Sequence, residues 1–451
     1  MKSQKKLNLL DSTMLVIGSM IGSGIFIVSA GMSRDLLSVE NLLLAWLLTG
    51  IMTFFAALSY AELGAAMPKA GGQYIYLKEA YGKLFGFLYG WTLFAVIQTG
   101  TIAAVGVAFA KFTGVLLPVI SEKNALFSIG SFHISTVQLL AIAVIWLLTF
   151  SNFREVKQGA FIQNIFTLSK IAALLFVIAA GFYFVWQSPT IHWKFDAAKL
   201  NIGELGIGIF AAAMVGSLFS SDAWNNITFT ASEIDKPERT LPYSLLLGTG
   251  AVTLLYLLSN LVYVNAISFE GIQHAESDRV GTLLMLTVFG QVGSVLMALL
   301  IMVSTFGCIN GLTLSGARVY YAMAKDGYFL KQAAVLNKNH SPQKALVMQA
   351  VWASLLTLSG SYGDLLDYVV FAVLLFYILT VAAVFVLRKK QPDLVRPYKV
   401  FAYPIVPAVY IIMASIICVS LLIYKPNYSY PGLAIVLAGV PVYWLIQRNQ
   451  K

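Results

Sequence analysis

Residues 17–26 of the chain, IGSMIGSGIF, place three glycines in a run that is otherwise apolar enough to cross a membrane. Glycine inside a helix costs about 1 kcal/mol relative to alanine, so we expect the helix to be interrupted here. An interruption frees backbone N–H groups, which bind a carboxylate, and carbonyl groups, which bind an ammonium. The stretch therefore predicts a site for both ends of a zwitterion. Close helix packing through Gly18 and Gly22 is the alternative, but the Gly22–Ser23–Gly24 run exceeds what packing requires.

A second polar stretch, VGSLFSSDAWNN, lies near the middle of the chain at residues 215–226. Ser220, Ser221 and Asp222 stand in the centre of an apolar segment, where a carboxylate needs a partner or a water-filled cavity. A continuous serine-rich helix, with Asp222 bonded to neighbouring backbone, is the alternative. Interrupted helices in corresponding places of two halves of a chain indicate the binding site of a secondary transporter.

Three further ionisable residues lie in or near apolar segments. Lys170, in FIQNIFTLSKIAALLFV, has no acid nearby in the sequence. Burying a lysine at a helix centre costs about 2.5–3.5 kcal/mol, so we expect Lys170 to have a partner in the core rather than to extend to an interface. We expect Lys111 to extend toward the outer surface, and Glu62 to act at a cytoplasmic-side gate or interface.

These residues must be positioned by membrane-spanning helices. The chain is 59% hydrophobic and 11% charged, whereas soluble domains are about 25% charged. Runs of about 20 apolar residues suffice to cross a bilayer. We expect twelve such spans, at residues 12–33, 40–66, 84–117, 134–152, 158–186, 203–232, 242–268, 281–314, 344–362, 365–387, 400–423 and 429–447.

The basic residues set the orientation of these spans. With the N-terminus inside, 22 of the 30 lysines and arginines fall in cytoplasmic segments and 6 in external ones. This bias follows the positive-inside rule and places both termini in the cytoplasm. It also explains the net charge of +10 without a nucleic-acid partner.

The remaining composition argues against other classes of protein. Cys308 and Cys418 lie in apolar runs, and the four histidines are scattered, so we expect no disulfide framework, metal or cofactor. No cluster of histidine, cysteine and acid stands at the end of a span, which argues against an enzyme. A channel would require a polar-lined pore or rings of charge, and the spans carry isolated ionisable groups instead.

Four motifs carry a family resemblance. They are GSMIGSGIF near the N-terminus, SYAELGAAMPKAGGQYIYLKEAYG at 59–82, LFSSDAWNNITFTASEIDKPERTLP at 218–242 and STFGCINGLTLSGARVYYAMAKDG at 304–327. Together they resemble the L-type amino acid transporter branch of the amino acid–polyamine–organocation superfamily. The resemblance implies an all-α, LeuT-like membrane fold of twelve helices, with two inverted five-helix repeats in which helices 1 and 6 are discontinuous. The repeats would cover residues 1–190 and 200–390, with two further helices in residues 400–451.

The resemblance also implies roles for individual residues. The backbone amides of Ser23, Gly24 and Ile25 would bind the carboxylate of the substrate, and the Ile21 carbonyl its amino group, with help from carbonyls around Phe219 and Ser220. Phe219 would close over the substrate from outside. The complete implied set of binding residues is Ile21, Gly22, Ser23, Gly24, Ile25, Phe219, Ser220, Ser221 and Asp222.

Two residues are implied in coupling. Lys170 matches the lysine that stands where sodium-coupled relatives bind an ion, which implies sodium independence. Tyr256, in LLYLLSN, matches a tyrosine that bridges toward this lysine. Asn310 falls in the similar eighth-helix stretch without an assigned role.

The chain departs from the family pattern in two places. The external segment 118–136 has no cysteine, so we expect no disulfide-linked heavy subunit and a stand-alone bacterial protein. The second interruption, Ser-Ser-Asp-Ala-Trp, lacks the aromatic that many relatives carry before Gly-Gly-Trp or Asp-Gly-Trp, which leaves the substrate open.

The resulting hypothesis is a sodium-independent exchanger in the bacterial plasma membrane. It would exchange small to medium neutral L-amino acids, such as alanine and serine, by alternating access, with membrane lipid as its surroundings. The alternative is a proton-coupled or cationic amino acid or polyamine permease that uses Asp222. A transporter-like nutrient sensor also remains open.

Overall fold

The computed structural model describes residues 6–69, 71–129, 132–153, 159–187, 196, 199–200, 202–338, 341–359 and 362–448. The described part of the chain is almost entirely helical. Its first half contains α1 (Leu9–Met20), η1 (Gly24–Phe26), α2 (Val28–Leu36), α3 (Val39–Ala66), α4 (Gln73–Tyr81), α5 (Lys83–Thr92), η2 (Leu93–Ile97), α6 (Gln98–Leu116), β1 (Ala125–Ile129), β2 (Phe132–Ser135), α7 (Thr136–Ser151) and α8 (Gly159–Gln187).

The second half contains α9 (Ile202–Leu205), α10 (Ile207–Ala213), α11 (Val215–Ser220), η5 (Trp224–Glu233), α12 (Pro237–Ala266), α13 (Phe269–Gln273), η6 (Glu276–Asp278), α14 (Val280–Lys325), η7 (Lys331–Ala334), α15 (Gln343–Thr357), α16 (Tyr362–Lys390), α17 (Ile405–Tyr424) and α18 (Pro426–Arg448). The two strands form an antiparallel hairpin between α6 and α7.

Several helices begin at capping residues that the sequence supplies. Asn8 accepts a hydrogen bond from the Asp11 backbone N–H at 2.9 Å, and the Asp11 carboxylate accepts one from the Asn8 N–H at 3.2 Å. This reciprocal pair satisfies free N–H groups at the start of α1. Ser135 and Gln138 form the same motif at the start of α7.

A multi-pass membrane protein is the architecture that these helices define. Among the described residues, nine helical segments are long and apolar enough to cross a membrane, while α1 and α7 are apolar but shorter. The interruption predicted within the first span, 12–33, is confirmed, because α1 ends at Met20 and α2 begins at Val28. Helix α14 extends beyond the predicted span 281–314 and continues to Lys325. The predicted ninth span, 344–362, ends as helix α15 at Thr357, and its residues 360–361 lie outside the described part.

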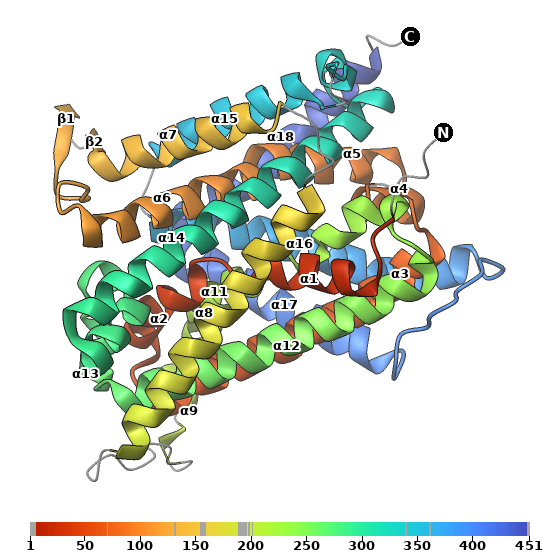
Figure 1. Cartoon of the computed structure of the whole chain (residues 1–451). Coiled ribbons are helices and arrows are strands. Elements are labelled where there is room, and N and C mark those ends of the chain that lie inside the picture. The colour runs from red at the N-terminus through yellow and green to blue at the C-terminus, as the bar shows by residue number, and fades with distance from the viewer. Residues whose placement is uncertain are drawn as a thin grey trace.

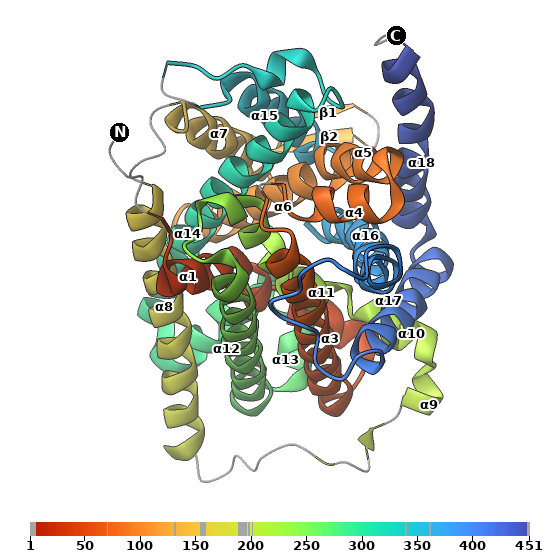
Figure 2. The same ribbon diagram turned by 90° about the vertical axis from the view of Figure 1, so that its right-hand side faces the viewer.

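The helices pack in two groups, with the interrupted segments between them (Figure 1). One group contains α6, α7, α14 and α15, which contact one another. The other contains α1, α3, α8 and α12. Figure 2 shows the same arrangement from the side, with α11 and α16 lying near the boundary between the groups.

Contacts between distant segments gather at opposite ends of the bundle. Segments predicted to be cytoplasmic meet at one end, where Lys78 on α4 lies 2.7 Å from Asp326 after α14. Segments predicted to be external meet at the other end, where Arg34 on α2 lies 2.8 Å from Asp278. In Figure 1 the first of these ends, with α4, lies to the right, and the second, with α13 and the hairpin, to the left. Arg154 and Lys157, which we predict to be cytoplasmic, lie outside the described residues.

Candidate functional site

The interruption of the first helix exposes consecutive backbone groups within the buried core. Helix α1 ends at Met20, Ile21 is extended with φ −72° and ψ 97°, and η1 begins at Gly24. Within the described residues, the N–H groups of residues 22–25 and the Ile21 carbonyl have no hydrogen-bond partner. Buried backbone groups are normally hydrogen-bonded, so this cluster of unpaired groups indicates a binding site for a polar ligand. Four donors beside one acceptor suit a carboxylate next to an ammonium.

The interruption of the sixth predicted span lies against the first. Helix α11 ends at Ser220, Ala223 adopts a left-handed conformation with φ 65°, and η5 begins at Trp224. Gly24 packs so tightly here that a Cβ atom on it would stand 2.9 Å from Ser220 Cβ. The absence of a side chain at Gly24 therefore allows the two interruptions to touch.

Tyr256 on α12 connects the two interruptions. Its hydroxyl lies 3.0 Å from the Met20 carbonyl oxygen and 3.1 Å from that of Ser220, and it can donate to either. The family resemblance implied a bridge from Tyr256 toward Lys170. The Tyr256 hydroxyl meets the carbonyl ends of α1 and α11, and Lys170 bonds to the Gly18 carbonyl in the same last turn of α1.

Lys170 on α8 has the core partner that its burial predicts. Its Nζ donates a hydrogen bond to the Gly18 carbonyl at 2.8 Å, and the side chain is 1% exposed. The ammonium therefore sits against the last turn of α1, where cations are favoured by the partial negative charge of free carbonyls. The thiol of Cys308 on α14 approaches the same region and would lie 3.6 Å from a Cβ on Gly22.

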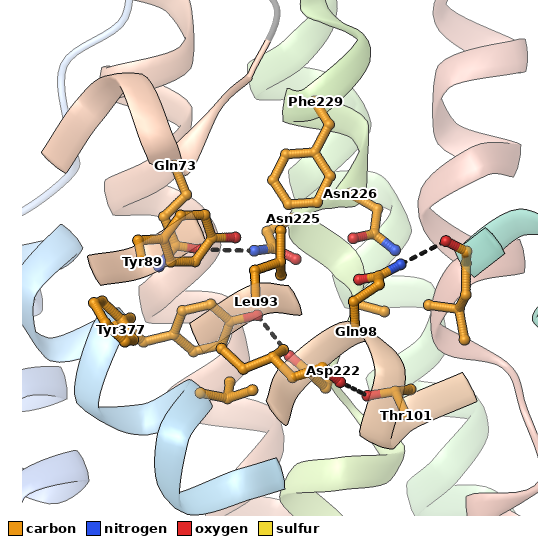
Figure 3. A pocket seen from close by; sticks show the side chains of 15 residues that line it. Gln73, Tyr89, Leu93, Gln98, Thr101, Asp222, Asn225, Asn226, Phe229 and Tyr377 are labelled. Atoms are coloured by element: carbon orange, nitrogen blue, oxygen red, sulfur yellow. Dashed lines mark hydrogen bonds between the residues drawn. The ribbon is translucent and has the colours of Figure 1, made fainter. Parts of the chain in front are cut away.

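Asp222 lies between two cavities that are separated by Tyr377 of α16. Among the residues that line them, Asp222 is the one ionisable acid, and Ser221 lines the second cavity. The Tyr377 hydroxyl donates to Asp222 Oδ1 at 2.5 Å (Figure 3). This contact rules out the alternative in which Asp222 bonds to neighbouring backbone alone. No salt bridge to Asp222 occurs among the described residues.

The wall of the first cavity combines apolar residues with a group of polar side chains. The Asn225 side-chain amide donates to Gln73 Oε1 at 3.0 Å, and Gln73 in turn donates to the Thr380 hydroxyl at 3.0 Å. Figure 3 shows Asn226, Gln98 and Thr101 facing the same space, with the rings of Tyr89, Phe229 and Tyr377 around it. A cavity with amide and hydroxyl groups can hydrogen-bond a small polar side chain.

Phe219 occupies the opposite side of the interruptions. Its ring meets that of Tyr362 edge to face, with centroids 6.3 Å apart. The Tyr362 hydroxyl lies 3.2 Å from the Ser23 hydroxyl. Both rings thus lie beside the exposed backbone groups, where Phe219 was expected to cover the substrate.

Sequence reasoning missed four residues of this site. Gln73 and Asn225 lie inside the motifs that carried the resemblance, so their polar side chains were visible signals. Tyr362 and Tyr377 gave no signal, because a tyrosine near the start or middle of an apolar helix is common at membrane interfaces. Their partners Ser23 and Asp222 lie 339 and 155 residues away in the sequence.

Two ionic contacts lie at the end of the bundle that is predicted to be cytoplasmic. Glu62, 2% exposed, accepts hydrogen bonds from Arg388 at 2.6 and 2.9 Å and from the Val400 backbone N–H at 2.7 Å. At Asp326, partial burial favours the neutral acid, but hydrogen bonds from Lys78 and Tyr74 outweigh it and lower the pKa of the carboxyl. These pairs join α3 to α16 and α4 to α14.

Lys111 differs from its prediction. Its side chain is 7% exposed rather than extended into solvent, and its Nζ lies 3.2 Å from Glu122 Oε1. The partner stands in the connector between α6 and the hairpin. The pair therefore closes part of the outer end of the bundle.

A membrane-embedded helical bundle with two interrupted helices in contact is the arrangement of secondary transporters. The family model described as amino acid permease matches residues 7–446, and the chain belongs to this family. It is 32% identical over 447 residues to the large neutral amino acids transporter small subunit 2 of Mus musculus, covering 98% of this chain and 81% of the relative. It is 30% identical over 451 residues to the serine/threonine exchanger SteT of Bacillus subtilis, covering 99% and 98%. It is 28% identical over 450 residues to the b(0,+)-type amino acid transporter 1 of Mus musculus, covering 98% and 88%.

Proposed function

We propose that the protein is a sodium-independent exchanger of small to medium neutral L-amino acids, such as alanine and serine. The observation that carries this proposal is the cluster of free N–H groups at residues 22–25 beside the free Ile21 carbonyl. The N–H groups would bind the carboxylate and the carbonyl the ammonium. These contacts involve the part that all amino acids share, and they leave the side chain to the second interruption.

The polar cavity beside Asp222 supports a small polar side chain as cargo. Gln73, Asn225 and Asn226 offer amide groups at its wall. A serine hydroxyl could use the hydrogen-bonding capacity that remains at these amides beyond the bonds joining Asn225, Gln73 and Thr380, whereas an apolar side chain could not. The similarity to a serine/threonine exchanger over 99% of this chain points the same way.

The ammonium of Lys170 supports sodium independence. It donates a hydrogen bond to the Gly18 carbonyl at 2.8 Å. A fixed positive charge disfavours the binding of a second cation in the same low-dielectric space. We further propose that exchange is faster than uniport because the Lys170 contact resets slowly without substrate.

The proposed architecture has twelve spans with two inverted five-helix repeats in residues 1–190 and 200–390, followed by a two-helix unit in 400–451. The interruptions of α1–η1 and α11–η5 support corresponding first helices in the two repeats. The positive-inside bias supports cytoplasmic termini in a bacterial plasma membrane. The absence of cysteine in 118–136 supports a protein that acts without a disulfide-linked heavy subunit.

The decisive experiment is countertransport into proteoliposomes. Purified protein is reconstituted, and uptake of radiolabelled serine is measured with and without internal amino acid, under varied sodium and proton gradients. We expect uptake to depend on internal amino acid and to be unaffected by sodium. Equal flux with empty liposomes would contradict exchange, and stimulation by a sodium gradient would contradict sodium independence.

A second candidate function rests on Asp222, an acid inside the cavity without a basic partner among the described residues. Such a carboxylate could bind a cationic side chain or carry a proton. Replacing Asp222→Asn distinguishes the two functions. Loss of lysine or arginine uptake with serine uptake retained would favour the cationic permease, and the absence of lysine uptake by the unaltered protein would exclude it.

A further inference from the structure

Tyr362 begins α16 at the outer side of the site and is 3% exposed. Its hydroxyl lies 3.2 Å from that of Ser23. Ser23 is one of the four residues whose backbone N–H groups have no partner in the described part of the chain. The phenol is therefore a side-chain hydroxyl from another helix that lies beside this group of donors.

Two side chains from other helices contact the Tyr362 ring. The Phe219 ring packs against it at 81° between ring planes. From the outer side, Lys111 Nζ lies 5.8 Å from the ring centroid, and Lys111 is anchored by Glu122 at 3.2 Å. A cation over the face of a tyrosine is attracted by the ring, so this layer favours the observed orientation. The hydroxyl is thus aimed inward and the ring faces the outer end.

The hydrogen bond between the Tyr362 and Ser23 hydroxyls is weak, because it is 3.2 Å long and joins two neutral groups. A neutral hydrogen bond contributes about 0.5–1.5 kcal/mol, whereas one to a charged group contributes about 1.5–3 kcal/mol. A carboxylate held by the N–H groups of residues 22–25 would bring a charged acceptor within reach of the phenol. The Tyr362 hydroxyl would then form a stronger hydrogen bond with the carboxylate than it forms with Ser23.

We propose that Tyr362 binds the carboxylate of the cargo through its hydroxyl and covers it from the outer side with its ring. This inference rests on the proposed function and adds a side-chain donor to a carboxylate site otherwise made of backbone. It also gives α16 a direct contact with the cargo, so that occupancy of the site is linked to the position of α16.

The test compares Tyr362→Phe with Tyr263→Phe. The first change removes the hydroxyl and keeps the ring. The second is a matched control, because the Tyr263 hydroxyl on α12 is buried, has no hydrogen-bond partner among the described residues and stands outside the site. Affinity is measured by competition against labelled serine in proteoliposomes, using serine and serine methyl ester, which has no carboxylate. Serine-induced stabilisation of the detergent-purified protein against heat gives a second readout that needs no transport.

We expect Tyr362→Phe to weaken the binding of serine about tenfold and to leave the weak binding of the ester unchanged. Tyr263→Phe should change neither affinity. Equal weakening of serine and ester, or unchanged serine affinity, would overturn the proposal. If the phenylalanine variant is not recovered as folded protein, Tyr362→Trp, which keeps a ring and an N–H donor, is compared with Tyr362→Leu. The tryptophan variant should then bind serine more tightly, and equal affinities would overturn the proposal. Absence of amino acid transport by the unaltered protein would instead contradict the proposed function itself.

Discussion

The two interrupted helices face each other and both leave backbone groups unpaired, but they differ in the side chains beside those groups. At the first interruption, the N–H groups of residues 22–25 and the Ile21 carbonyl have no partner among the described residues. At the second, the N–H groups of Trp224 and Asn225 have none there either. The second interruption also brings two polar side chains, Ser221 and Asp222, to the wall of a cavity.

This difference suggests a division of labour. Backbone groups are identical for every sequence, so a site built from them suits the carboxylate and ammonium that all amino acids share. Side chains can vary, so a site built from them suits discrimination between cargos. The first interruption would then set the class of cargo and the second its selectivity.

The largest expected effect follows from filling the space between the two interruptions. In Gly24→Val, the new Cβ would meet Ser220 Cβ at 2.9 Å and its Cα at 3.0 Å, so the interruptions must separate and the N–H groups shift. We expect serine uptake to fall at least a hundredfold, because misplacement of about 1 Å disrupts a preorganised site. Proteoliposome uptake is measured together with the amount of inserted protein.

Gly250→Ala is the matched control for this change, since nothing lies within 4 Å of a Cβ at Gly250 in α12. It should leave uptake unchanged and stabilise the helix by up to about 1 kcal/mol. Uptake retained in Gly24→Val would show that the contact between the interruptions is dispensable.

A smaller effect is expected from cutting the connection through Tyr256. Tyr256→Phe leaves the carbonyls of Met20 and Ser220 without their shared donor, and an unsatisfied buried carbonyl costs about 1–3 kcal/mol. We expect serine uptake to fall about tenfold with the protein still folded. The control is again Tyr263→Phe. If the two variants transport equally well, the connection does not coordinate the interruptions.

The smallest effect concerns the backbone of the second interruption. Ala223 has φ 65°, a conformation that costs an alanine about 1 kcal/mol and a glycine almost nothing. Ala223→Gly should therefore raise the thermal stability by up to about 1 kcal/mol, with serine uptake changed less than twofold. Ala213→Gly, in the regular helix α10, should instead lower it by about 1 kcal/mol or more. A loss of stability in Ala223→Gly would show that the alanine methyl packs favourably.

Sequence reasoning located the interruptions but not their surroundings. Gly22, Gly24 and Asp222 were recognisable because glycine and carboxylate are costly inside a membrane helix. The contacts of the Tyr256 hydroxyl with the Met20 and Ser220 carbonyls were not predictable, since a sequence shows the hydroxyl but not which carbonyls lie near it.

The remaining contacts depend on packing between helices that are remote in the sequence. Glu62 was identified as an interface residue, yet its partner Arg388 lies 326 residues away. The Asp222–Tyr377 pair likewise joins helices whose relative rotation no apolar pattern specifies. We predicted twelve spans from hydropathy, and nine helical segments among the described residues are long and apolar enough to cross a membrane. The short α1 and the long α14 show that helix boundaries depend on interruptions and on extensions beyond the apolar run.

The central claim, that the first interruption binds both ends of an amino acid, is tested most directly by removing one end at a time. Labelled serine uptake is challenged with unlabelled serine, with ethanolamine, which lacks the carboxylate, and with 3-hydroxypropionate, which lacks the ammonium. The account predicts that serine competes and that both analogues fail at a hundredfold higher concentration, because each loses a charged interaction worth about 1.5–3 kcal/mol and leaves buried backbone groups unpaired. Competition by either analogue within tenfold of serine would contradict it.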